Sequence, residues 1–198
     1  MSAPDSGQRA EDYSHLSARG QALVARFRDA VVARVATGGP DSVLEVGCGQ
    51  GWLLARIAET LPDTALHGLD VRADAIEYAA RLVPEASLTV GDGASLPYPD
   101  RSFAVVVCSQ VIEHVEDPVR VLAEIRRVGK GHAVISVPHE PWFWAANLAR
   151  GKYLPTLGNC PGHIHHYTSR SLARLLRTQF SSAEVSTSFP WLVADVVW

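Results

Sequence analysis

Residues 43–51 read Val43-Leu44-Glu45-Val46-Gly47-Cys48-Gly49-Gln50-Gly51. A short apolar run passes here into glycines at every second position, and a helical pattern follows at once. Glycine lets a backbone turn tightly and approach a ligand closely, and the N-terminus of the following helix favours polar ligand groups. A plain strand-to-helix turn does not need three alternating glycines. We therefore expect this loop to bind a ligand.

The spacing of the glycines and the residues beside them exclude two common nucleotide loops. Dinucleotide-binding folds use G-x-G-x-x-G, whereas this chain has G-x-G-x-G. No Lys-Ser/Thr pair follows, as a nucleoside-triphosphate loop would require. Glu45 would add a negative charge beside a pyrophosphate, so it favours a ligand that carries an ammonium group instead.

Strand and helix patterns alternate on both sides of this loop. Apolar runs predict strands at 42–46, 65–69, 87–90, 103–108, 132–137, 183–189 and 192–197. Amphipathic patterns predict helices from 17 to the glycines at 38–39, at 52–61, at 74–83, from 118, and at 169–180, while 138–167 shows no clear period. This alternation predicts an α/β fold: a Rossmann-like, doubly wound, mostly parallel seven-stranded sheet with helices on both faces. The ligand should lie at the carboxyl ends of the strands.

Composition sets the class of protein. The 198 residues suit one domain, which we divide into a tail and helix at 1–40 that caps the active site and a main part at 41–198 with a substrate lid at about 138–167. Eighteen basic and 21 acidic side chains give a net charge of −3, which argues against a nucleic-acid partner. Three cysteines and the absence of a long apolar run predict a cytoplasmic protein without a membrane span.

Two acidic residues follow neighbouring predicted strands. Asp70 closes the second strand, where a carboxylate can accept hydrogen bonds from both hydroxyls of a ribose. Asp92 follows the third strand, where it can accept a hydrogen bond from an exocyclic amine, although it could equally be a solvated loop residue. Together with the glycine loop, these residues outline a site for an adenosine.

The glycine loop, Asp70 and Gly91-Asp92 resemble the class I S-adenosylmethionine-dependent methyltransferases. Two further stretches, Pro97-Tyr98-Pro99-Asp100-x-Ser102-Phe103 and residues 111–118, resemble the type-11 subgroup, which is related to the quinone-biosynthesis methyltransferases. The resemblance covers about residues 42–189. It implies S-adenosylmethionine as the cofactor, and methyl transfer to a hydroxyl or carbon of a small molecule such as a lipid, a quinone or a specialised metabolite.

The same resemblance implies roles for individual residues. The methionine part of the cofactor would be surrounded by Glu45, Gly47, Gly49 and Gly51. Asp70 would hold the ribose, Val71 would flank the adenine, and Asp92 with Gly93 would face the adenine amine. The floor beneath the sulfonium would be formed by Ser109 and Gln110.

His114 is the expected catalytic residue. A base is needed when the acceptor must lose a proton, and the pKa of histidine suits that task. His114 follows the fourth strand, which should end at the cofactor. The alternative is a histidine at a helix start that only packs or forms a hydrogen bond, and its neighbour Glu113 is expected to be structural.

The segment 138–167 is rich in histidine and aromatic residues. Its histidines, His163, His165 and His166 with His139 upstream, form either a lid for a metal or an acceptor, or a polar loop that returns to the last helix. The 110–114 stretch with a later histidine also resembles metal-dependent small-RNA 2′-O-methyltransferases, which have a glutamate where this chain has Gln110. For that reason the sequence predicts no metal site and no effect of a chelator.

The acceptor pocket is expected in the same segment. Its aromatic residues, Trp142, Phe143, Trp144 and Tyr153, either roof an apolar acceptor pocket or simply cover the edge of the sheet. Arg150 and Lys152 suggest an anionic group on a lipid-like acceptor. One alternative is an RNA 2′-O-methyltransferase or protein methyltransferase. A positive stripe beside the pocket would favour it, and the sequence shows no such stripe. The other alternative is a non-catalytic cofactor-binding protein.

Overall fold

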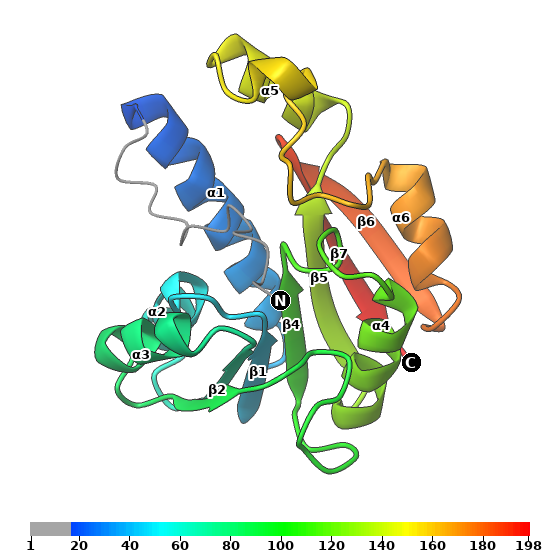
Figure 1. Cartoon of the computed structure of the whole chain (residues 1–198). Helices are drawn as coiled ribbons and strands as arrows, with labels where there is room; N and C mark the ends of the chain where they lie inside the picture. The colour runs from blue at the N-terminus through cyan, green and yellow to red at the C-terminus, as the bar shows by residue number, and fades with distance from the viewer. Residues whose placement is uncertain (1–16) are drawn as a thin grey trace, which may run out of the picture.

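Seven strands form one twisted sheet in the computed structural model, which describes residues 17–198 (Figure 1). The strands are β1 (Ser42–Val46), β2 (Ala65–Asp70), β3 (Ser87–Val90), β4 (Val105–Ser109), β5 (His132–Pro138), β6 (Ser182–Ser188) and β7 (Trp191–Val197). Their order is β3-β2-β1-β4-β5-β7-β6, with β1 to β5 parallel and β7 antiparallel to both of its neighbours. The predicted mostly parallel seven-stranded sheet is confirmed. The strand order reverses between β1 and β4, which is where such folds bind ligands.

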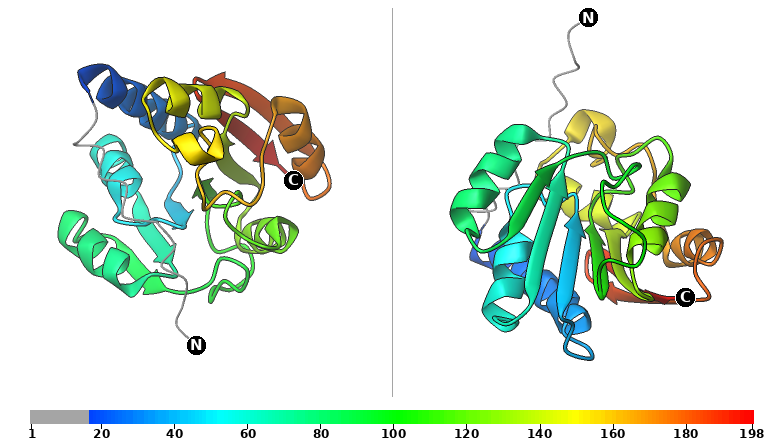
Figure 2. Two further views of the ribbon diagram at one scale, coloured as in Figure 1. Left: turned by 45° about the horizontal axis from the view of Figure 1, so that its top comes forward. Right: turned by 90° about the horizontal axis from the view of Figure 1, so that it is seen from below.

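Helices cover both faces of the sheet (Figure 2). The α-helices of the described residues are α1 (Ala18–Val35), α2 (Trp52–Thr60), α3 (Ala73–Leu82), α4 (Pro118–Val128), α5 (Trp142–Ala149) and α6 (Ser169–Leu176), and all of them except α5 lie on the faces. Alternate residues of β4 point to opposite faces, so Val105 and Val107 pack with α1 and α2, whereas Val106 and Cys108 pack with α4 and α6. This two-sided burial explains why the central strands are apolar throughout. None of the helices in residues 17–198 is long and apolar enough to span a bilayer.

Helix starts follow local sequence signals. The Asp117 side chain accepts a hydrogen bond from the Arg120 N–H at 3.0 Å, and Pro118 occupies the first turn of α4. Ser17 caps α1 in the same way. The largest difference from the predicted strand bounds is in β4, which begins at Val105 because Phe103 instead forms an isolated bridge with Gly129. Other strand ends differ by one residue.

The segment 138–167 contains a helix that the sequence pattern did not predict. Helix α5 and a short 3₁₀ turn, η2 (Leu154–Thr156), lie beyond the carboxyl ends of β4 and β5 (Figure 1). Helix α5 carries apolar side chains on nearly every side, so it has no amphipathic period by which it could be recognised. Helix α1 packs on the sheet, and the Phe27 ring stacks on Trp191 with centroids 4.7 Å apart. The predicted tail at residues 1–16 lies outside the described residues.

Candidate active site

The glycine loop lies at the carboxyl end of β1, and its three glycines have positive φ angles of 74°, 52° and 81°. A Cβ atom on Gly47 would meet the Val111 side chain at 2.3 Å, and one on Gly51 would meet the Ala79 Cβ at 3.0 Å. A Cβ on Gly49 would have no neighbour within 4 Å. Packing therefore requires two of these glycines, whereas the third borders open space where a ligand can approach the backbone.

Asp70 joins the end of β2 to this loop. Its Oδ2 accepts a hydrogen bond from the Gly49 N–H at 2.8 Å, and its Oδ1 accepts one from the Arg72 N–H at 2.9 Å. The N–H groups of Gly47 and Cys48 donate to the Leu69 carbonyl at 2.7 and 3.0 Å. A carboxylate can accept about four hydrogen bonds, so Asp70 retains capacity for both hydroxyls of a ribose.

Glu45 supplies negative charge beneath the loop. It lies in β1 opposite Gly68 and Val107, and its side chain is buried. Burial raises the pKa of the Cys48 thiol, and the carboxylates of Glu45 and Asp70 raise it further. The thiol therefore stays protonated, and the carboxylates of Glu45 and Asp70 are the groups here that could attract a cationic ligand.

The other predicted adenosine-site residues lie along the same edge of the sheet. Val71 is 71% exposed although it is apolar, which leaves a surface that an adenine ring could cover. Asp92 is exposed, and its Oδ1 accepts a hydrogen bond from the Ala94 N–H at 2.8 Å. A Cβ on Gly93 would meet the Val46 Cγ1 at 2.9 Å, so packing alone accounts for this glycine. Contacts of these residues with adenine remain predictions.

Ser109 and Gln110 end β4 in an unusual conformation. Gln110 has a φ of 59°, and its N–H donates to the Ser136 carbonyl at 2.9 Å. The hydroxyls of Ser109 and Ser136 lie 2.8 Å apart, and the Gln110 amide donates to the Ser136 hydroxyl at 3.3 Å. A left-handed residue other than glycine is uncommon and is often found at functional sites. Sequence analysis missed Ser136, whose only signal was a serine within an apolar strand.

His114 contacts the lid segment. Its Nδ1 lies 2.8 Å from the Gly162 carbonyl oxygen. A carbonyl can only accept, so Nδ1 carries the proton and the lone pair of the neutral ring is on Nε2. The N–H groups of Ile164 and His165 donate to the Glu113 carbonyl at 2.9 and 3.1 Å, which attaches the lid to the turn at 111–115. The structure thus brings together the predicted catalytic residue and the predicted lid.

The lid histidines have different surroundings. The His163 ring lies 4.8 Å from the His114 ring between centroids, and burial, with smaller contributions from His114 and His166, lowers the pKa of His163 to about 4. One carboxylate oxygen of Glu113 and one nitrogen each of His114 and His163 all lie within 4.8 Å of one another. By contrast, the His165 Nε2 lies 3.0 Å from the Val115 carbonyl, and His166 packs on the Trp144 ring.

The aromatic side chains in and after α5 differ in their exposure to solvent. Phe143 lies between the rings of His163 and Trp191, at centroid distances of 5.6 and 6.4 Å. Trp142 is 53% exposed and Tyr153 is exposed as well, so neither roofs an enclosed pocket in this conformation. Arg150 donates to the Asn147 Oδ1 at 2.6 Å, and this contact at the end of α5 occupies part of its guanidinium.

Glu140, at the start of the lid, was not predicted as a site residue. Its side chain is buried, and its Oε2 accepts a hydrogen bond from the Trp144 N–H at 3.2 Å. Its Oε1 has no hydrogen-bond partner within residues 17–198. Burial raises the pKa of Glu140 to about 7, against the effect of the hydrogen bond from Trp144. The sequence around Glu140, a glutamate before a proline, does not indicate that this side chain is buried.

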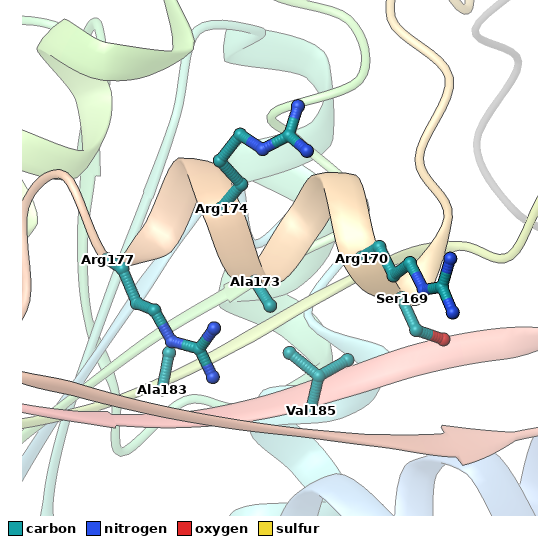
Figure 3. Close-up of a pocket in the computed structure, with 7 residues that line it drawn as sticks. All are labelled: Ser169, Arg170, Ala173, Arg174, Arg177, Ala183 and Val185. Atoms are coloured by element: carbon teal, nitrogen blue, oxygen red, sulfur yellow. The ribbon is translucent and has the colours of Figure 1, made fainter.

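A hollow lies between α6 and β6 (Figure 3), with a volume of about 560 Å³. Three of its lining residues are arginines: Arg170 and Arg174 of α6, and Arg177, which caps the C-terminus of that helix. This is a group of positive charges that the sequence did not predict, because the helical spacing alone does not show which residues are exposed. It borders the β6 edge of the sheet, whereas the glycine loop follows β1, four strands away in the sheet order.

The sequence matches known proteins over the same region. Residues 44–137 match the family described as "Methyltransferase domain". The demethylmenaquinone methyltransferase of Thermotoga maritima is 31% identical over 56% of this chain and 49% of its own length. A protein of Mycolicibacterium smegmatis, named a probable S-adenosylmethionine-dependent methyltransferase, is 32% identical over 69% of this chain and 50% of its own length. The chain thus spans about half or less of the length of the curated relatives that it matches.

The fold matches solved structures over nearly the whole chain. A plantazolicin methyltransferase, solved with a monoazolic desmethyl analogue and S-adenosylhomocysteine, superposes with a TM-score of 0.73 at 18% identity. The match covers 90% of this chain and 86% of that one. The sequence match and the sheet order agree: residues 44–137 match a methyltransferase domain, and the chain has the fold of the solved methyltransferase.

Proposed function

We propose that this protein transfers the methyl group of S-adenosylmethionine to a hydroxyl or carbon of a small molecule. The observation that carries the proposal is the pairing of Gly49, which borders open space, with Asp70, whose carboxylate is fixed against the Gly49 N–H at 2.8 Å. An uncovered stretch of backbone at Gly49 thus lies beside the oriented carboxylate of Asp70. The methionine part of the cofactor could lie along the backbone, while the hydroxyls of the ribose bind the carboxylate.

The charge of the site suits the cofactor. S-adenosylmethionine carries a sulfonium and an ammonium, and the buried Glu45 provides a negative charge below the loop. In the transfer, the acceptor atom attacks the methyl carbon and the carbon–sulfur bond breaks, so the sulfonium becomes a neutral thioether. Holding the two reactants in line can lower the barrier by about 7–11 kcal/mol, which makes positioning the main task of the protein.

We propose that His114 removes the proton of the acceptor when no metal ion is bound. Its Nε2 carries the lone pair because Nδ1 donates to Gly162, and the turn at 111–115 follows the carboxyl end of β4. A base in this position would take the hydroxyl or carbon proton as the methyl bond forms. The Gly162 carbonyl then stabilises the correct tautomer and would also face the proton on Nδ1 of the imidazolium.

The lid favours an apolar acceptor. Phe143 lies against His163, so an acceptor that reaches His114 would also meet an aromatic ring. Arg150 is a weaker candidate for binding an anionic group of the acceptor, because its guanidinium already donates a hydrogen bond to Asn147. We therefore propose a lipid-like or quinone-like acceptor. The free thiols of Cys48, Cys108 and Cys160 support our proposal of a cytoplasmic location.

An RNA acceptor is the weaker candidate. It would require cationic side chains around the glycine loop, to bind the phosphates that flank the methylated ribose. The arginines at α6 border β6, the edge strand that is four strands away from β1 in the sheet order. We do not extend the proposal to RNA on this basis.

The test is a transfer assay with the whole chain. S-adenosylmethionine labelled in the methyl group is incubated with the protein and with separated lipid, quinone and RNA fractions. We expect label in an organic-soluble fraction and calorimetric binding of S-adenosylhomocysteine. Binding of S-adenosylhomocysteine without label in any fraction would favour the non-catalytic alternative, and label in RNA would overturn the proposed acceptor class.

A further inference from the structure

We propose that Glu113, His114 and His163 bind one divalent transition-metal ion at the acceptor side of the site. Only the catalytic consequence of this inference rests on the proposed function, because ion binding can be measured without turnover. The sequence had predicted no metal, and the inference comes from the distance that the fold establishes between the turn at 111–115 and the lid. These segments are about 50 residues apart in the chain and join at the carboxyl end of β4.

The three side chains offer a suitable ligand set. One carboxylate oxygen and two imidazole nitrogens lie within 4.8 Å of one another. In a tetrahedral zinc site with bonds of about 2.0–2.1 Å, neighbouring ligand atoms are about 3.3 Å apart, so modest side-chain rotations would close the set around an ion. Two histidines and one carboxylate leave a coordination position open, as in catalytic zinc sites. Imidazole ligands favour zinc, cobalt or nickel over magnesium.

The groups behind the ligands support the same conclusion. Metal-binding histidines usually donate their other ring N–H to a carbonyl or carboxylate, which fixes the tautomer. His114 does this with the Gly162 carbonyl at 2.8 Å. The Nδ1 of His163 is buried and has no hydrogen-bond partner within the described part of the chain.

The surroundings of the cluster hold its ligands in place. The Glu113 side chain is only 1% exposed, so its carboxylate has little freedom to turn toward solvent. The lid is also attached here, by the hydrogen bonds from Ile164 and His165 to the Glu113 carbonyl. The cluster is therefore held from both sides before an ion arrives.

A bound ion would define the acceptor more closely. The open position would take a hydroxyl oxygen of the acceptor, and the ion would lower the pKa of that hydroxyl. Its proton would leave to water, the oxygen would attack the methyl carbon, and the carbon–sulfur bond would break. The ion and a proton compete for the Nε2 of His114, so in the metal-bound enzyme His114 is a ligand and not the base. The acceptor would then be a phenol or enol rather than an amine. Gln110 need not be a glutamate, because three ligands suffice.

The test is a titration of the chelator-treated whole chain with Zn²⁺ by calorimetry, and with Co²⁺ by visible absorption. We expect one ion per chain in the wild type and binding that is weaker by about 100-fold or more in His163→Ala. His166→Ala is the matched control, because it removes a histidine of the same loop that lies outside the cluster. Wild-type-like binding in His163→Ala, or no stoichiometric binding in the wild type, would overturn the inference.

Two further measurements separate this inference from the proposed function. Glu113→Gln should also lose the ion, with far-UV circular dichroism as the check that this buried change leaves the chain folded. S-adenosylhomocysteine is titrated into the metal-free protein in parallel. Binding of S-adenosylhomocysteine without binding of Zn²⁺ would remove the metal site and leave the proposed function standing. Loss of S-adenosylhomocysteine binding would contradict the proposed function, whatever the ion does.

Discussion

The three glycines after β1 all have a positive φ angle, but they are required for different reasons. Gly47 and Gly51 lie against Val111 and Ala79, so side chains there would collide with the protein itself. Gly49 has no such neighbour, and its N–H is bonded to Asp70. At this position the glycine preserves space for a ligand rather than room for packing. Substitution at Gly49 therefore tests binding more directly than substitution at its neighbours.

We expect Gly49→Val to abolish binding of S-adenosylhomocysteine while the fold persists. A β-branched side chain would fill the open space and would strain a φ of 52°, at a cost of about 1–2 kcal/mol. Gly39→Val is the matched control, because Gly39 also has a positive φ and no neighbour within 4 Å but lies in the turn between α1 and β1. Calorimetry should show normal binding for the control only. If both variants bind alike, the loop is an ordinary turn.

Asp70→Ala should lose most of the affinity for the cofactor. Each lost hydrogen bond to a charged acceptor costs about 1.5–3 kcal/mol, so affinity should fall by more than about tenfold. Asp74→Ala provides the control, because it removes a nearby carboxylate that pairs with Arg72 at the surface. Calorimetry with S-adenosylhomocysteine measures both. Affinity near wild type in Asp70→Ala would remove the ribose assignment.

His114→Ala should reduce turnover by about 10²–10⁴ and leave cofactor affinity within a few-fold. The reduction follows because either role proposed for His114, base or ligand, acts on the proton of the acceptor. Turnover is measured with the acceptor found in the transfer assay, with His132→Ala as the control at a histidine that contacts Asp195 near the other end of β5. A decrease of less than tenfold would mean that positioning alone carries the reaction.

At the scale of elements, helix α5 in the segment 138–167 is an apolar run with one polar anchor. Asn147 is buried, and its amide donates to the Gly158 carbonyl at 2.9 Å, which closes the loop that follows α5. Phe143 and Trp142 are neighbours in the chain, but the first lies against His163 and the second is mostly exposed. The element thus has an inner and an outer aromatic surface, which allows a matched comparison.

We expect Phe143→Ala to raise the KM for the acceptor severalfold, because it removes an aromatic surface beside His163. Trp142→Ala should change it little, since that ring is 53% exposed. Cofactor affinity should stay constant in both variants. Steady-state kinetics with a varied acceptor measures the difference. Equal effects of the two substitutions would show that α5 only covers the edge of the sheet.

At the scale of the whole molecule, burial of Glu140 links stability to pH. The pKa of this carboxyl is about 7 in the folded chain, above its ordinary value of 4.5. Between these values the folded state holds a proton that the unfolded state has lost, so the free energy of unfolding falls as pH rises. At 1.36 kcal/mol per pKa unit, the total decrease is about 3 kcal/mol.

Glu140→Gln should remove this decrease. Urea unfolding at pH 5 and at pH 7.5 should show a smaller loss of stability in the variant than in the wild type. Glu184→Gln is the control, because Glu184 is exposed on β6 and should leave the wild-type pH dependence unchanged. The same pH dependence in Glu140→Gln and wild type would mean that the carboxyl is hydrated and not buried in solution.

The sequence by itself determined the features that depend on neighbours in the chain. The apolar run, the alternating glycines and the following helix are consecutive, so β1, the loop and α2 could be predicted from residues 43–61. Asp117 and Pro118 likewise predicted the start of α4, because a helix cap acts over three residues. The parallel sheet followed from the repetition of such units, and the place of Asp70 followed from the parallel β1–β2 pair.

Only the tertiary structure decided what depends on residues far apart in the chain. His114 meets Gly162 and His163 about 50 residues later, and no local pattern gives the direction in which a lid returns. The burial of Glu140 and the left-handed φ of Gln110 depend on packing that no propensity describes. Helix α5 was missed because an evenly apolar helix has no period. Packing brings these groups to one edge of the sheet, since the carboxyl ends of parallel strands converge there.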